Sequence, residues 1–100
     1  MASSLTTGFI FGQKDVATAG TQLQLDSTTT RRVRSVLIIA HSDNAGRIFY
    51  GGSDVDSSTQ KGLAPGESVS IDGVVPFAIG DIYIDSANNN DGVDFVGVLA

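Results

Sequence analysis

The chain has 100 residues, a formal net charge of −5 and no cysteine. This length fits one domain, and the missing cysteines exclude disulfides and thiolate metal sites. An acidic surface repels the phosphate backbone of nucleic acids, so we expect no nucleic-acid partner. No apolar stretch reaches the roughly 18 residues of a membrane helix, and residues 1–9 lack the blocks of a signal peptide. We therefore expect no membrane partner either.

Residue usage favours strands over helices. Gly, Thr, Ser, Asp and Val are abundant, and apolar residues do not recur at helical spacing over three turns. Strand-length segments alternate with turn signals, a pattern typical of sandwiches and barrels. We predict an all-β, single-domain antiparallel β-sandwich, jelly-roll-like, of about seven or eight short strands. Residues 1–12 are expected to be an N-terminal arm or extended segment, and residues 13–100 the β-sandwich domain.

The first ordered segments are predicted on either side of Gly20. Phe9–Phe11 begins a strand that continues through Gln13–Thr18, and Thr21–Leu25 alternates polar and apolar residues. Because Gly20 suits a tight turn, we expect these two strands to form a hairpin.

Val33–Ala40 is predicted to be the most buried strand. Val36–Ala40 is apolar at both parities, which is typical of a central strand or one covered on both faces. The unit from Gly46 to Ile71 organises the next part of the chain. It comprises a strand over Arg47–Tyr50, a loop, a turn at Pro65–Gly66 with type II chemistry, and a strand over Ser68–Ile71.

Three further strands complete the chain. Val74–Ile79 contains Pro76, which cannot donate a ladder hydrogen bond, so we place it at an edge or outside the sheet. Asp81–Asp85 directs Ile82 and Ile84 inward. After a tip loop at Asn88–Gly92, Val93–Leu99 is the closing strand.

Candidate catalytic groups are sparse. The single histidine, His41, follows the most buried strand, but no nucleophile-elbow sequence accompanies it, so we interpret it as structural. The acid pairs Asp54/Asp56 and Asp91/Asp94 fall in loops or at loop edges, where solvent leaves carboxylates ordinary. We expect no catalytic residue and no enzyme activity.

The run Asp85–Asp94 is rich in the oxygen ligands that calcium prefers. Aligning Gly92 with the EF-hand glycine places Ala87 at the first ligand position and Val98 at the closing one, so the pattern fails at both ends. Hairpin tips favour Asn, Asp and Gly for conformational reasons. We therefore expect no metal and no cofactor, with an adventitious cation in this loop as the alternative.

Two groups of residues are candidates for partner contact. Three of the six cationic residues lie within four positions: Arg31, Arg32 and Arg34. They suit contact with an acidic surface, or equally a charged strand that discourages edge pairing. Leu5, Phe9, Ile10 and Phe11 are apolar residues in a polar N-terminal segment, which could anchor it on a partner.

The order and spacing of several segments resemble those of small β-sandwich virion proteins of tailed bacteriophages, most like capsid decoration (cement) proteins. The resemblance spans roughly Gln13 to Phe95, and no single motif within it is diagnostic. Met1–Gly12 and Gly73–Gly80 are less familiar. The segments that carry it are Gln13–Val16, Thr18–Thr21, Leu23–Leu25, Val36–Ala40, Ile48–Val55, Leu63–Ser68, Ile82–Asp85 and Gly92–Phe95.

The resemblance implies a structural virion protein that is assembled in the bacterial host cytoplasm and binds the outside of an assembled capsid. Its expected partners are the major capsid protein and further copies of itself, with a trimer favoured and a dimer possible. A tail, baseplate, neck or head-fibre component is the alternative, followed by a carbohydrate-binding β-sandwich module. Sugar sites favour exposed aromatic residues, and this chain has two tyrosines and no tryptophan.

Overall fold

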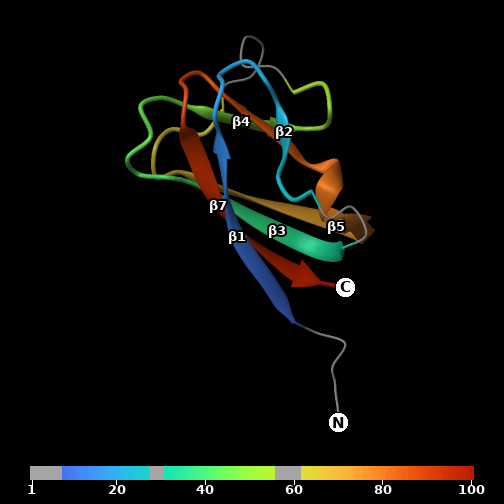
Figure 1. Ribbon diagram of the computed structural model, residues 1–100. Helices are drawn as coiled ribbons and strands as arrows, with labels where there is room; N and C mark the ends of the chain where they lie inside the picture. The colour runs from blue at the N-terminus through green and yellow to red at the C-terminus, as the bar shows by residue number, and fades with distance from the viewer. Residues whose placement is uncertain (1–7, 28–30, 56–61) are drawn as a thin grey trace.

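A computed structural model describes residues 8–27, 31–55 and 62–100, which form seven strands and one short 3-10 turn (Figure 1). Leu5, in the expected arm, and Asp56 lie outside the described residues. The elements are β1 (Phe9–Val16), β2 (Leu23–Gln24), β3 (Arg32–Ala40), β4 (Ile48–Gly51), β5 (Ser68–Ala78), η1 (Ile79–Asp81), β6 (Tyr83–Ser86) and β7 (Asp91–Leu99).

The strands form two sheets that lie as separate layers in Figure 1. The four-stranded sheet has the order β1-β7-β3-β5, and the three-stranded sheet has the order β2-β6-β4. All neighbouring strands are antiparallel. The prediction of an all-β sandwich is therefore confirmed.

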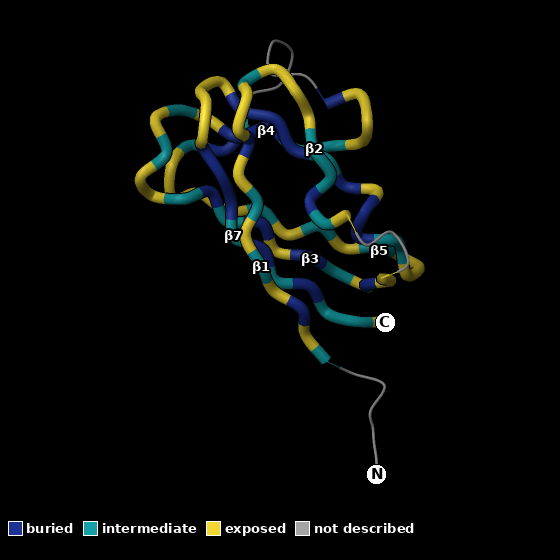
Figure 2. Tube along the Cα trace, viewed as in Figure 1, coloured by how far each residue is buried: buried dark blue, intermediate teal, exposed yellow. Residues whose placement is uncertain are grey.

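The core lies between the two sheets and is made by one side of each strand. On β3, Val33, Val36 and Ile38 are fully buried and alternate with exposed or half-buried residues. The register shifts between Val33 and Ser35, so Arg34 is an extra residue and the alternation resumes in phase after it. On the facing sheet, Ile48 and Ile84 complete this core (Figure 2).

Within the described residues, the four-stranded sheet is covered on one face only. β3 pairs with β7 on one side and β5 on the other, so its predicted central position is confirmed. The other alternative, a strand covered on both faces, does not apply, because Leu37 is 37% exposed and Ile39 is half-buried. Successive residues of this apolar run point to opposite faces. One alternating row therefore lies in the core, and the other lies on the open face of the sheet.

The predicted hairpin around Gly20 is also wrong. The turn exists, with Thr21 N–H donating to the Thr18 carbonyl at 3.1 Å and Gly20 at a φ of +88°. The two strands nevertheless diverge, because β1 pairs with β7 whereas β2 pairs with β6 in the other sheet. The turn is a corner between the sheets.

Strand β1 crosses the expected boundary between residues 12 and 13. Phe9 to Gly12 pair with β7, and Ile10 is only 9% exposed and belongs to the core cluster. Residues 9–12, expected in an arm or extended segment, are extended and form the first half of an edge strand.

Two local predictions around β5 are confirmed. Glu67 N–H donates to the Ala64 carbonyl at 2.9 Å, and Gly66 has a φ of +85°, as the Pro65–Gly66 turn requires. Pro76 lies on an edge strand. The strands predicted separately over Ser68–Ile71 and Val74–Ile79 are instead one strand, β5, with a bulge. Ser35 pairs with Asp72 and Val33 with Phe77, which leaves residues 73–76 outside the register.

Ile38 and Leu37 provide a test of which row of β3 forms the core. Ile38→Ala removes a fully buried side chain and should lower the free energy of unfolding by about 2–5 kcal/mol. Leu37→Ala, on the open face, should cost about 1 kcal/mol or less. Urea unfolding at one fixed protein concentration measures both, and equal losses would contradict the one-sided core.

Candidate functional site

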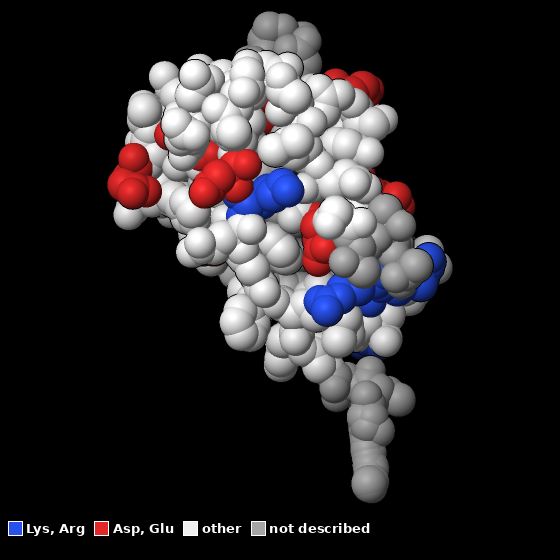
Figure 3. Space-filling view, in the orientation of Figure 1, with Lys and Arg blue, Asp and Glu red and all other residues white. Residues whose placement is uncertain are grey.

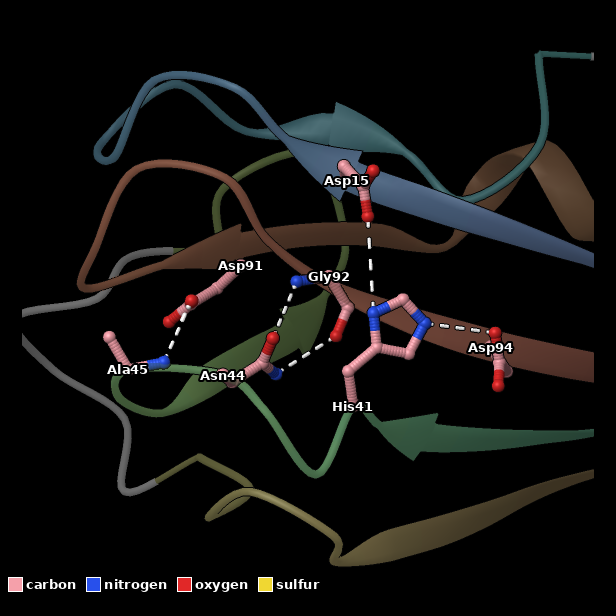
Figure 4. Close-up of polar contacts among 7 residues, drawn as sticks. All are labelled: Asp15, His41, Asn44, Ala45, Asp91, Gly92 and Asp94. Atoms are coloured by element: carbon pink, nitrogen blue, oxygen red, sulfur yellow. Dashed lines mark hydrogen bonds and ion pairs between the residues drawn. The ribbon is translucent and has the colours of Figure 1, made fainter.

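His41 lies at the end of β3, between carboxylates from two other strands (Figure 4). Its Nε2 is 2.9 Å from Asp94 Oδ1 on β7, and its Nδ1 is 4.0 Å from Asp15 Oδ1 on β1. Since a carboxylate only accepts, Nε2 carries the proton in this contact. Both ring nitrogens face carboxylates rather than a hydroxyl, so the ring is not placed to activate a serine. The arrangement joins three strands.

The loop after His41 is held by side chains that replace strand pairing. The Asn44 amide donates through Nδ2 to the Gly92 carbonyl and accepts through Oδ1 from the Gly92 N–H, both at 2.9 Å. Buried Asp91 accepts from the N–H groups of Ala45 and Gly46, also at 2.9 Å. A Cβ at Gly92 would lie 2.8 Å from the Lys14 carbonyl oxygen, so glycine is required here. Sequence reasoning missed both roles, which depend on long-range pairing.

The carboxylates of Asp91 and Asp94 do not form a catalytic pair. Asp91 pairs with buried Val16 and points inward, whereas Asp94 pairs with Gln13 on the open face. Residues three apart on a strand lie on opposite faces. Asp54 is exposed, and its expected partner Asp56 is outside the described residues.

Asp85 and Asn89, in the 85–94 segment, accept hydrogen bonds from backbone N–H groups. Buried Asp85 accepts through Oδ1 from Gly20 at 2.9 Å and Ser86 at 2.8 Å, and Asn89 Oδ1 accepts from Ala19 at 2.8 Å. The contacts with Gly20 and Ala19 fasten the β1–β2 corner to β6 and to the β6–β7 loop. Within the described ranges no three His, Asp or Glu side chains are grouped to hold a metal ion.

The arginine cluster lies at the start of β3, beside the β5 bulge. Arg32 Nη2 donates to the Pro76 carbonyl at 2.9 Å. Arg34 lines a small hollow of about 210 Å³ with residues 73–76, where Val74 is fully exposed. Figure 3 shows Lys and Arg side chains gathered at the lower right of the view, beside the grey atoms. The cluster is therefore solvent-facing, with one arginine bound to the bulge.

The outer face of the four-stranded sheet, on the side away from the core, carries exposed apolar side chains. Phe9 and Phe11 of β1 are 70% and 81% exposed. They pair with Val98 and Val96 of β7, which in turn lie beside Ser35 and Leu37 of β3. Residues directly opposite share a face, so these strands form one apolar surface. We call it the outer apolar face: Phe9, Phe11, Leu37, Ile39, Val96 and Val98.

The residues predicted to contact a partner lie in three different places in the structure. Phe9 and Phe11 lie on the outer apolar face, whereas Ile10 is in the core and is not available as an anchor. Arg31, Arg32 and Arg34 are exposed at one end of β3. Sequence reasoning missed Leu37, Val96 and Val98. The available signal was that each is an apolar residue at a position that alternates with the core residues of its strand.

Comparison with known proteins gives no relative: no family model, curated protein or solved structure matches this chain. In the part of the chain that the structure describes, no helix is long and apolar enough to cross a membrane.

The Asn44 amide should be sensitive to loss of its donor. Asn44→Asp keeps the acceptor for Gly92 N–H but sets a carboxylate oxygen against the Gly92 carbonyl, so we expect a loss of about 1–3 kcal/mol in the free energy of unfolding. Asn89→Asp is the matched control, because that amide oxygen accepts from Ala19 and a carboxylate can do the same. Urea unfolding of both variants measures the difference, and equal stabilities would contradict the two-way pairing.

Proposed function

We propose that this protein is a structural virion protein, a decoration (cement) protein that binds the outside of an assembled phage capsid and stabilises the junctions between capsomers. The observation that carries the proposal is the outer apolar face, which no element of the described chain covers. The sequence resemblance supplies the virion setting, and the uncovered face supplies a surface for docking.

The outer apolar face has the composition of a binding surface. Contiguous exposed apolar area with a polar rim marks interaction sites on soluble proteins, and aromatic side chains dominate binding energies at such sites. Phe9 and Phe11 are the aromatic residues here. The rim is polar, with Ser68 and Ser70 of β5 on one side and Gln13 paired with Asp94 at one end.

Binding of this kind would stabilise a shell by mass action. A ligand that binds an assembled lattice but not its free subunits shifts the equilibrium towards the lattice. The shell repeats the same site many times by symmetry, so a modest contact per copy is sufficient. The proposed role therefore needs a docking face and no catalytic group.

A tail, baseplate, neck or head-fibre component could use the same face, and copy number separates it from a decoration protein. Quantitative mass spectrometry of purified particles should give a copy number in the hundreds relative to the major shell protein, in step with the icosahedral lattice. A few copies to a few dozen would assign the protein to the tail or fibres. Absence from particles would overturn the virion proposal.

A carbohydrate-binding module is the further alternative, and the open hollow of about 630 Å³ beside His41 is the place for it. Its lining includes no Phe, Tyr or Trp side chain on which a sugar ring could stack. Tyr50 packs against the core instead, and Tyr83 is half-buried. Specific binding on a glycan array would favour this alternative over docking on protein. The lining residues are Gln13, Ile39, Ala40, His41, Ser42, Asp43, Gly66 and Asp94.

Charge placed on the outer apolar face should abolish docking. Leu37→Lys and Val96→Lys put an ammonium group at the centre of the face, where these two residues are register partners. Burying that charge against a shell costs enough to weaken binding by about tenfold or more. Co-sedimentation with undecorated capsids measures the effect.

Val74→Lys is the matched control, since Val74 is an exposed valine in the β5 bulge, outside the register of the sheet and not a member of the outer apolar face. Its shell binding should be unchanged. Wild-type binding by folded Leu37→Lys and Val96→Lys would show that the shell contact lies elsewhere.

A further inference from the structure

Among the strands that the structure describes, β1 has a neighbour on one edge only, and the hydrogen-bond pattern identifies which of its backbone groups face the other edge. Leu99 N–H donates to the Gly8 carbonyl at 2.9 Å, and Asn90 N–H donates to the Val16 carbonyl at 2.8 Å. The even-numbered residues of β1 therefore direct their backbone N–H and C=O groups towards β7. Because direction alternates along an antiparallel strand, Phe9, Phe11 and Gln13 direct theirs away from the sheet. This edge is a template for another strand.

The first half of the β1 edge lacks the usual protection against pairing. Edge strands are commonly protected by charges, prolines, bulges or short length. Phe9 to Gln13 contains no charge and no proline, and the first charges of β1 are Lys14 and Asp15.

The other sheet edges in the described structure are protected. β5 carries Pro76 and the residue 73–76 bulge. β2 has two residues, and β4 has four and is bridged by Leu63. The β1 edge is therefore the long unprotected one.

We propose that this edge pairs with the same edge of a second copy of the chain, antiparallel about a two-fold axis that passes beside Phe11. The outward-facing residues set the register: Phe11 lies opposite Phe11 of the second copy, and Phe9 lies opposite its Gln13. Each pair exchanges backbone hydrogen bonds, and like faces meet because the paired residues share parity. The two four-stranded sheets become one continuous sheet.

The second copy is favoured as the occupant for two reasons. A two-fold interface uses the same patch on both partners, and the pairing at Phe11 joins two aromatic side chains across the strands. Ring-forming assembly would instead need β1 to pair with a different edge, and the protected β5 edge cannot supply it. The geometry therefore favours a dimer over the trimer expected from the sequence resemblance. It needs no capsid, and it would bring the outer apolar faces of two copies side by side.

Engineered cysteines test the pairing on the purified chain, which has no cysteine of its own. A hydrogen-bonded antiparallel pair has Cα atoms about 5.5 Å apart, within the range of a disulfide. Phe11→Cys should form disulfide-linked dimers under mild oxidation at least about tenfold faster than Val74→Cys, an exposed control on β5. Equal rates would overturn the proposal.

Light scattering from about 1 to about 500 μM protein gives the second measurement. The wild type should approach twice the chain mass of 10.3 kDa, whereas Phe11→Lys, which sets two like charges opposite each other, should stay monomeric. Circular dichroism checks that the variant is folded. A monomeric or trimeric wild type, or a dimer that survives Phe11→Lys, would overturn the proposal without bearing on shell binding by the outer apolar face.

Discussion

The inner row of β3 is the constraint on which the rest of the structure depends. Val33, Val36 and Ile38 are fully buried between the sheets, while the backbone of the same strand pairs with β7 and β5. One strand thus fixes both the core and the order of the larger sheet. Because side chains alternate, burying one row directs Leu37 and Ile39 to the opposite face. The outer apolar face is a direct result of an apolar sequence on a strand with one covered side.

At the polar end of the sandwich, side chains bind backbone groups of distant segments. Asp91, Asp85 and the Asn44 amide each bind peptide N–H groups of segments far away in the sequence. The His41 ring joins β7 to the end of β3 and lies near Asp15 of β1. These Asp, Asn and His side chains, whose types are common in active sites, here hold loops and strands together. The surface that we propose for binding is therefore the outer apolar face.

Local signals predicted local structure well, and long-range partners escaped them. The Pro65–Gly66 turn and the inward Ile82 and Ile84 follow from residue type and alternation. The turn at Gly20 was predictable, but the assignment of its flanking strands to different sheets depends on pairing with β7 and β6. The apolar run Val36–Ala40 fits a strand covered on one or both faces equally well, so the run alone does not predict that its second face is the outer apolar face.

The placement of charge along β3 contributes a dipole component along this strand. Arg31, Arg32 and Arg34 cluster where the strand begins, and Asp15, Asp43 and Asp94 gather near its end beside His41. Eight steps of about 3.3 Å separate Arg32 from Ala40, so the two ends lie roughly 26 Å apart. In the field of a charged surface this component favours an approach with the arginine end towards negative potential. The preference along the strand axis weakens as salt screens the field.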